Sequence, residues 1–445
     1  MVVNTPYENS FRRQANMELG EIKLQFLSPS IMLVCTTLLF FITLLFIPFD
    51  VLQPLSISGI VFWFICWFCF LGGGVLGAGN RTKMQISNFN NRKKTTEKFV
   101  AYIVIFGLIG VVFQIVDRYF IRGVSFFESA FEVRDVLFET KASLFSVIAA
   151  LFGSIGMLSY IVIWIAENAR VKIRKVVKAL SLISLMGAFF MSVQIGSRSL
   201  VLILAITYIL TWVFSSRFRC KKLNKYRIFL IVFFVVTLIV SAALVMAARV
   251  ELMGIAMTTS ILYSTYAYTI QPSNLILSAI EGSDFEVLFA ALFSVIQYVY
   301  HGIYEFGLLF SDFSGEHELG TQIFWLPFKL ASVLQIPIPV FQNTGVRDGI
   351  FTTFMGPVFI DFGLLSPFFL FIFGYIASLP YRFLLRGKVA WFPAAALVTT
   401  GMLFWPIMNI FTSASGTYLL VASIVIGIFG ETLNSSQKKY SVTFL

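Results

Sequence analysis

The fold of this chain is decided by residues 179–214, which read ALSLISLMGAFFMSVQIGSRSLVLILAITYILTWVF. Arg198 is the one charged residue in this stretch. As a single α-helix the stretch would be about 54 Å long at 1.5 Å per residue, whereas the hydrocarbon core of a bilayer is about 30 Å thick. The stretch is therefore predicted to form two membrane helices joined at Gly196-Ser197-Arg198.

Arg198 is consequently placed at the tip of a helical hairpin. Basic clusters flank the hairpin on both sides, at 170–178 and 217–227. Because both flanks must lie on the same side of the membrane, the tip must reach the opposite face. A permanent charge at that place is costly, and it marks Arg198 as a candidate functional residue.

The composition places the whole chain in the same class. Hydrophobic residues make up 58% and charged residues 12%, and the mean hydropathy is +0.87. These values predict an all-α, polytopic integral membrane protein. The formal charge of +11 is spread over short basic clusters between apolar segments, which is the pattern of cytoplasmic loops and not of a nucleic-acid-binding surface. We expect no cleaved signal peptide, because a long polar stretch precedes the first apolar segment.

Ten membrane spans are predicted in one helical bundle. With the N-terminus inside, most of the 33 Lys and Arg residues fall in the internal segments, so both termini are predicted to be cytoplasmic. We expect a single membrane domain, 1–445. The predicted spans lie near residues 30–48, 57–78, 99–116, 143–165, 179–195, 199–214, 228–247, 354–379, 389–407 and 415–430.

A large external loop is predicted at 248–353, and loops of this length usually carry a function. It is not hydrophilic throughout, since 285–310 and 323–340 are largely apolar. Such sequence is typical of helices that lie in, or dip into, the membrane interface. The alternative is an extra pair of spans within this segment, which would raise the count to twelve and leave the orientation of the later spans unchanged.

The sequence contains no recognisable metal or nucleotide motif. It has only two histidines, His301 and His317, and neither belongs to a metal-binding or hydrolase pattern. We therefore expect neither a cofactor nor a metal, and we expect any chemistry to take place on the external side.

Arginines near the external surface are the first candidates for binding a substrate. Arg198 is joined by Arg249, which follows the seventh predicted span, and by Arg134 in the second external loop, where Arg118 and Arg122 also lie. Guanidinium groups bind phosphate oxygens through paired, charge-assisted hydrogen bonds. The competing interpretation is that these arginines snorkel or pair with nearby acids such as Asp117, Asp135 and Glu251.

Two further clusters could take part in chemistry. In the first, Glu305 follows His301 by four residues, so on a helix the two share a face, and Tyr298 falls on the same face. A carboxylate or an imidazole there could act as a general base, although an aromatic interfacial belt is an equally good interpretation. In the second, Asp361 is the one acid within a predicted span, and it should have a partner. Arg347, Thr352 and Thr353 are the candidates, in a structural or a substrate-binding role.

The order of these features resembles the Wzy-type polysaccharide (O-antigen) polymerases of Gram-negative bacteria. The likeness rests on Gly196-Ser197-Arg198 at a hairpin tip, on the Tyr298–Phe306 segment in a large late external loop, and on the segment from Thr352 to Gly363 at the start of the next span. It implies an enzyme of the bacterial inner membrane that works at the periplasmic face. The implied fold is similar to that of membrane glycosyltransferases that use lipid-linked sugars, and to that of the O-antigen ligases.

The resemblance also implies substrates, partners and residue roles. The donor would be a glycan on undecaprenyl diphosphate and the acceptor a lipid-linked repeat unit, with a flippase and a chain-length regulator as partners. Basic residues such as Arg198 and Arg249 would hold the diphosphate. Glu305 or His301 would act as the base, and the resemblance does not choose between them.

Three other functions compete with polymerisation. An O-antigen ligase shares the donor and differs only in the acceptor. A lipid-linked repeat-unit flippase is a transporter, and transporters tend to carry repeats, broken helices and charges near the bilayer midplane. A membrane-bound acyltransferase would be expected to carry a histidine on a polar loop, and His301 alone gives little support for this function. Because the charges of this chain concentrate outside the spans, an enzyme is favoured.

Overall fold

The structure is a computed structural model of the full chain. It describes the backbone in eight ranges and at eleven further positions. The ranges are 28–79, 93–125, 143–168, 171–194, 198–215, 257–281, 285–339 and 350–442, and the single positions are Val133, Val136, Leu137, Thr140, Phe229, Phe233, Val236, Thr237, Val240, Ser283 and Arg347.

The protein is mostly helical and is a multi-pass membrane protein. Seven of the helices that the structure describes are long and apolar enough to cross a bilayer. They are α3 (Ile57–Ala78), α4 (Lys93–Ile115) with its π-helical continuation η4 (Val116–Ile121), α6 (Leu144–Asn168), α7 (Lys175–Gln194), α12 (Glu286–Asp312), α14 (Met355–Phe362) continued by α15 (Ser366–Leu385), and α17 (Ala414–Val442).

Three shorter apolar helices accompany them: α2 (Pro29–Leu44), α8 (Arg198–Ser215) and α16 (Phe392–Leu403). Nine of the ten predicted spans thus coincide with described helices. The tenth, 228–247, lies almost entirely outside the described residues. The predicted hairpin agrees with the structure, because α7 ends at Gln194 and α8 begins at Arg198.

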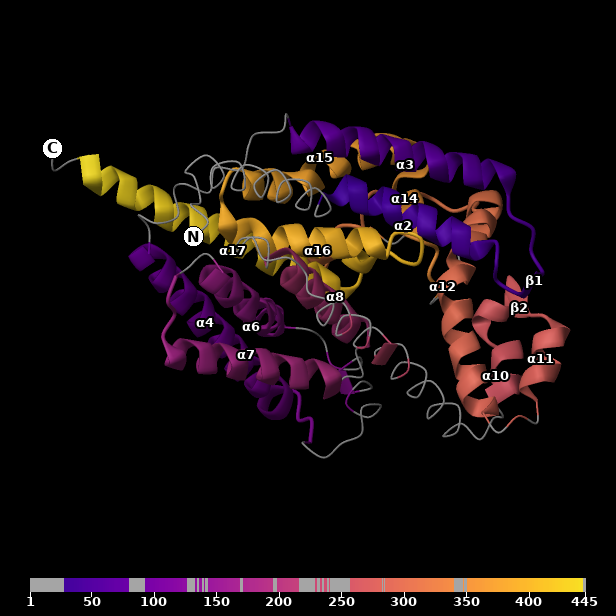
Figure 1. Cartoon of the computed structure of the whole chain (residues 1–445), viewed down its shortest axis with the longest axis horizontal. Helices are drawn as coiled ribbons and strands as arrows, with labels where there is room; N and C mark the ends of the chain where they lie inside the picture. The colour runs from indigo at the N-terminus through magenta and orange to yellow at the C-terminus, as the bar shows by residue number, and fades with distance from the viewer. Residues whose placement is uncertain are drawn as a thin grey trace, which may run out of the picture.

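The two ends of the bundle differ in character (Figure 1). One end, which we call the β1–β2 end, carries a two-stranded antiparallel sheet of β1 (Phe49–Val51) and β2 (Ile270–Pro272). The opposite end carries ion pairs of basic residues, which include Arg174 with Glu97 and Lys388 with Glu431. We call it the basic end.

The part of 248–353 that the structure describes is mostly helical apart from β2. It contains α10 (Met257–Leu262), the 3₁₀ turn η6 (Thr265–Tyr268), α11 (Asn274–Ile280), α12 and α13 (Trp325–Val333). Helices α10, α11 and α12 lie at the β1–β2 end (Figure 1). In the view of Figure 1, α12 runs across the direction of α2, α3 and α16. Among the described residues of this segment, α12 alone is long and apolar enough to cross a bilayer, so the pair of extra spans that twelve would require is not found there.

Close backbone packing joins α3 to α15. A Cβ atom at Gly73 or at Gly77 would collide with the backbone carbonyl of Phe371 or of Tyr375, respectively. Glycine at these positions lets the two helices approach more closely than any other residue permits, which is a common way to build membrane helix interfaces. Gly73 and Gly77 therefore serve the packing of α3 on α15.

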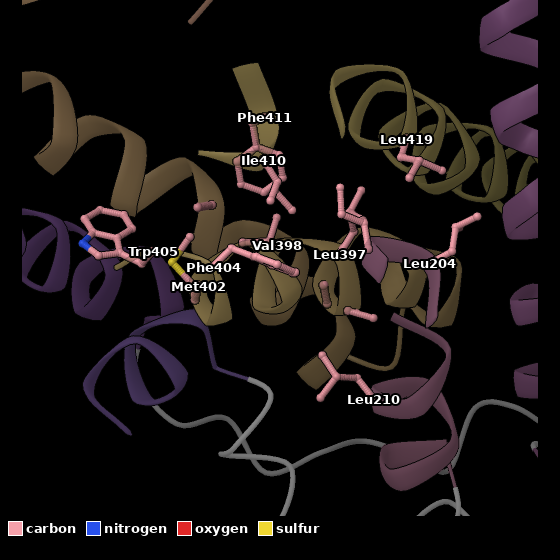
Figure 2. Packing of buried hydrophobic residues seen from close by; sticks show 14 of the residues in the cluster. Leu204, Leu210, Leu397, Val398, Met402, Phe404, Trp405, Ile410, Phe411 and Leu419 are labelled. Carbon is pink, nitrogen blue, oxygen red and sulfur yellow. The ribbon is translucent and has the colours of Figure 1, made fainter. Parts of the chain in front are cut away.

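The centre of the bundle is α16, which is surrounded by buried apolar side chains (Figure 2). Leucines of α8 and Leu419 of α17 pack around Leu397 and Val398. With 12 residues, α16 is about 18 Å long, which is shorter than the predicted span 389–407. The helix ends before Pro406, which offers no backbone N–H and whose ring would clash with the preceding turn. The residues from Phe404 to Asn409 continue as turns and irregular backbone before the 3₁₀ turn η9 (Ile410–Thr412).

Candidate functional site

Helix α12 supplies the central residues of the candidate site. Its middle segment packs against the β1–β2 end of the bundle: the hydroxyl of Tyr300 donates to Thr43 at the end of α2 (2.6 Å), and its ring stacks on Phe40. Glu305 and His301 lie one turn apart on α12 and are both buried. The sequence spacing predicted this shared face correctly.

Glu305 is paired with Arg347. The Nη1 atom of Arg347 donates to Oε1 of Glu305 at 2.6 Å, while its Nη2 atom donates to the carbonyl oxygen of Thr265 at 2.8 Å. The guanidinium carbon also lies 4.3 Å from the ring centroid of Tyr268, which is cation–π geometry. The Glu305 side chain is 2% exposed and that of Arg347 is 32% exposed. Solvent can therefore reach this ion pair from the arginine side.

His301 is enclosed by aromatic rings. Its ring centroid lies 4.3 Å from that of Tyr266 and 5.8 Å from that of Tyr298. Nδ1 lies 3.2 Å from the carbonyl oxygen of Gln297, and Nε2 is buried without a hydrogen-bond partner among the described residues. Since that oxygen can only accept, the contact is a hydrogen bond in the tautomer that carries its proton on Nδ1.

The segments that contain Thr353 and Ile407 approach the backbone of α12 closely beside His301. A Cβ atom at Gly302 would lie 3.0 Å from the carbonyl oxygen of Ile407 and 3.3 Å from the backbone N of Thr353. Thr353 itself is buried at φ 59°, a left-handed conformation that β-branched residues rarely adopt. Its hydroxyl accepts a hydrogen bond from the N–H of Met355, which begins α14. Thr353 also forms a β-bridge with Met408 in the segment after α16, and its backbone lies against Gly302 of α12. A strained residue therefore lies beside the candidate site.

Asp361 has partners that were not predicted. Its two carboxylate oxygens accept the backbone N–H groups of Gln322 (3.0 Å) and Ile323 (2.8 Å). Of the proposed partners, Arg347 binds Glu305, and the hydroxyl of Thr353 binds the N–H of Met355. The expectation that one of these residues pairs with Asp361 is wrong. Asp361 instead links the segment before α13 to α14. Gly363 (φ 53°) ends α14 two residues later, and a Cβ atom there would collide with the ring of His317.

The external arginines differ in how far the structure describes them. Arg118 donates to the carbonyl of Met191 near the end of α7, and Arg122 forms an ion pair with Asp117 (3.2 Å). The predicted pairing of Arg122 with Asp117 is therefore confirmed, whereas the buried Arg118 binds a backbone carbonyl. Arg134 and Arg249 lie outside the described residues. Arg198 begins α8, and only its backbone is described.

Sequence reasoning missed the contribution of the turn between α10 and β2. Thr265, Tyr266 and Tyr268 belong to this turn and contact the Arg347 guanidinium or the His301 ring. The tyrosines at 263, 266 and 268 were a visible signal. Their neighbour in space, however, is a helix more than thirty positions later, and spacing along the chain cannot reveal that contact.

The site combines a buried carboxylate, a partly exposed guanidinium and several tyrosines. Such a set can bind an anionic group, stack against a sugar ring and accept a proton. Within the ranges that the structure describes, no three His, Cys, Asp or Glu side chains are grouped so as to hold a metal ion. No family model, curated protein or solved structure matches this chain.

Proposed function

We propose that this protein polymerises lipid-linked oligosaccharide repeat units into a surface polysaccharide at the periplasmic face of a bacterial inner membrane. The observation that carries the proposal is the Glu305–Arg347 pair. It sets a carboxylate, which can accept a proton, beside a guanidinium, which can bind a diphosphate. The pair lies beside tyrosines that can stack on a sugar ring.

The charges at the two ends of the bundle support the proposed orientation. Basic clusters of cytoplasmic loops belong to the basic end, by the positive-inside rule. The β1–β2 end, where α12 and the turn at 265–268 lie (Figure 1), would then face the periplasm. Lipid-linked repeat units are available there and nucleotides are not, which agrees with a donor that carries its own diphosphate.

The reaction would be a direct displacement. Glu305 takes the proton of an acceptor hydroxyl, and the oxygen of that hydroxyl attacks the anomeric carbon of the donor glycan. As this C–O bond forms, the bond from the anomeric carbon to the diphosphate oxygen breaks, and the electron pair leaves with undecaprenyl diphosphate. Guanidinium groups that neutralise the leaving diphosphate supply the main electrostatic stabilisation. The proton on Glu305 then passes to the departing diphosphate or to water.

Glu305 is the better candidate for the base than His301. Its carboxylate touches a guanidinium that solvent can reach, so substrate groups can approach it by displacing one side chain. His301 is wholly buried between Tyr266 and Tyr298. We assign to His301 the role of positioning these two rings against the sugar.

The surroundings of Asp361 favour an enzyme over a flippase. A transporter would use an acid within a span to bind a coupling ion or a proton. Both oxygens of Asp361 are instead occupied by backbone N–H groups of the loop before α13. A ligase would share the donor site described here and would differ in its acceptor.

The test is deletion of the gene in its native host, followed by electrophoresis of the surface polysaccharide. Loss of the ladder, with core plus a single repeat unit remaining, supports a polymerase, and re-expression of the full chain should restore the ladder. Intact polymer that stays on its lipid carrier beside unmodified lipid A core would assign a ligase. Loss of both the polymer and the single-unit form would assign a flippase, and an unchanged ladder would refute all three.

A further inference from the structure

The Glu305–Arg347 pair is built asymmetrically. Arg347 offers one nitrogen to the carboxylate and another to the carbonyl oxygen of Thr265. It therefore does not make the two-pronged contact that arginine forms with a carboxylate in its strongest pairs. The arginine side of the pair is open to solvent, whereas the carboxylate is almost completely covered. Of the two partners, Arg347 is the one that an incoming ligand can capture.

Tyr268 allows the guanidinium to change partners. Its ring lies against the guanidinium carbon at 4.3 Å, and the tyrosine is 52% exposed. A stacked ring holds the plane of the guanidinium without using any of its N–H groups. The group can therefore turn its donors from Glu305 towards an anion while it remains on the ring.

A diphosphate would compete well for Arg347. It presents several oxygens and more negative charge than one carboxylate, and guanidinium groups bind phosphate oxygens through two parallel hydrogen bonds. Removal of the cation leaves Glu305 as a buried charge with only the side-chain hydrogen bond of Thr269 beside it, which is strongly unfavourable. Uptake of a proton relieves this cost. The acceptor hydroxyl supplies that proton in the proposed reaction, and water supplies it when no acceptor is bound.

We propose that Arg347 exchanges partners, so that it covers Glu305 in the empty protein and moves to the diphosphate of the bound donor. This inference rests on the proposed function and adds to it a dependence of the base on the bound donor. Glu305 becomes able to take a proton only when a donor is in place, so an acceptor alone is not activated. The ligand class that the exchange recognises is a diphosphate, either attached to a lipid or free.

Asp361 provides an internal control for this exchange. Like Glu305 it is a buried carboxylate, but its partners are backbone N–H groups of Gln322 and Ile323. These backbone groups cannot leave Asp361 for a ligand. A ligand that frees Glu305 should therefore leave the reactivity of Asp361 unchanged.

The test measures the labelling of both carboxyl groups by a hydrophobic carbodiimide, which reacts with protonated carboxyls. The purified full chain in lipid nanodiscs is labelled with and without undecaprenyl diphosphate, and the modified residues are quantified by mass spectrometry. We expect the rate of Glu305 labelling to rise at least fivefold, in a saturable way, and that of Asp361 to stay constant. A rate at Glu305 that stays the same or falls would overturn the exchange. Equal increases at both residues would overturn it as well.

Two further arms identify the source of the diphosphate and the role of Arg347. A response to inorganic pyrophosphate equal to that of the lipid would mean that the diphosphate alone is recognised, and a response to the lipid only would make the polyprenyl chain part of the ligand. In Arg347→Ala, labelling of Glu305 should be high with and without ligand. Arg347→Lys, which keeps the charge, should restore low labelling and part of the response. Low, ligand-independent labelling in a folded Arg347→Ala protein would contradict the proposal.

Failure of this inference is distinguishable from failure of the proposed function. If deletion of the gene removes the polysaccharide ladder while the diphosphate lipid leaves Glu305 labelling unchanged, the polymerase proposal stands and the exchange does not. If Glu305 responds to the lipid while the ladder is independent of the gene, the diphosphate site stands and polymerisation is refuted. Should Arg347→Ala fail to fold, the titration of the unmodified protein remains decisive.

Discussion

Oε1 of Glu305 lies 2.6 Å from Nη1 of Arg347, although the two residues are 42 positions apart in the chain. This contact joins the middle of α12 to the segment before α14. It also explains how an acid can be buried almost completely at the β1–β2 end of the bundle, because an isolated carboxylate there would be strongly unfavourable. The predictions below begin with this pair and move outward.

Replacement of Glu305 by Gln should abolish most of the activity without unfolding the protein. The amide oxygen of Gln can still accept the hydrogen bond from Arg347, but the side chain can no longer take a proton. General bases contribute about 10²–10⁴-fold to a rate, so we expect the polymer yield to fall by at least about 100-fold. Complementation of the deletion strain, with the protein level checked by immunoblot, measures this. Normal polymer in the Gln variant would eliminate Glu305 as the base, and His301→Ala would then be the next variant to test.

Replacement of Arg347 by Ala should destabilise the protein, because it leaves Glu305 buried without its cationic partner. Breaking a fully buried pair costs about 3–5 kcal/mol, and the partial exposure of Arg347 reduces this to about 1–3 kcal/mol by solvent screening. The double variant Arg347→Ala/Glu305→Gln should recover most of the loss, and with the two single variants and the unmodified protein it completes a double-mutant cycle. Thermal unfolding of the four proteins in detergent gives the coupling energy, and additive effects would show that the two side chains do not stabilise each other.

Replacement of Asp361 by Asn should reduce stability and leave the chemistry intact. Two backbone N–H groups donate to the carboxylate, and Asn offers only one oxygen to accept them. A hydrogen bond to a charged group contributes about 1.5–3 kcal/mol, so the melting temperature should fall measurably. Activity per folded molecule, assayed at low temperature, should remain close to that of the unmodified protein. A large loss of activity without a loss of stability would instead place Asp361 in the reaction.

Two neighbouring glycines of α3 provide a matched test of helix packing. A Cβ atom at Gly73 would collide with the backbone carbonyl of Phe371, whereas one at Gly72 would make ordinary contacts of 3.6 and 3.7 Å with the Phe371 ring. We expect Gly73→Ala to cost about 1–3 kcal/mol or more by overpacking and Gly72→Ala to be nearly neutral. Yield and thermal stability in detergent report the difference, and equal behaviour of the two variants would refute the packing of α3 on α15.

Replacement of Arg198 by Ala should slow glycan transfer by about 10- to 100-fold, which corresponds to the loss of one hydrogen bond to a charged group. Arg198→Lys keeps the charge but loses the two-pronged geometry, so it should retain an intermediate activity. The measurement is polymer length and yield in the deletion strain. Polymer of normal length from Arg198→Ala would show that this arginine only ends the hairpin.

The sequence by itself determined the class of the protein and most of its helices. Long apolar segments must be helical in a membrane, because lipid offers no hydrogen-bond partners to exposed backbone groups. The hairpin of α7 and α8 and the shared helical face of His301 and Glu305 both follow from local spacing. Each of them depends on residues that are near one another in the chain.

Tertiary structure alone decided which charged groups meet. Asp361 could have paired with Arg347 or with a threonine hydroxyl on sequence grounds, and it binds two backbone N–H groups instead. Arg347 binds Glu305, and tyrosines from the turn at 265–268 complete the site. A side chain has a fixed helical neighbour three or four positions away. Its partner across the bundle depends on how helices pack, and the packing of many apolar surfaces leaves no local pattern that identifies that partner.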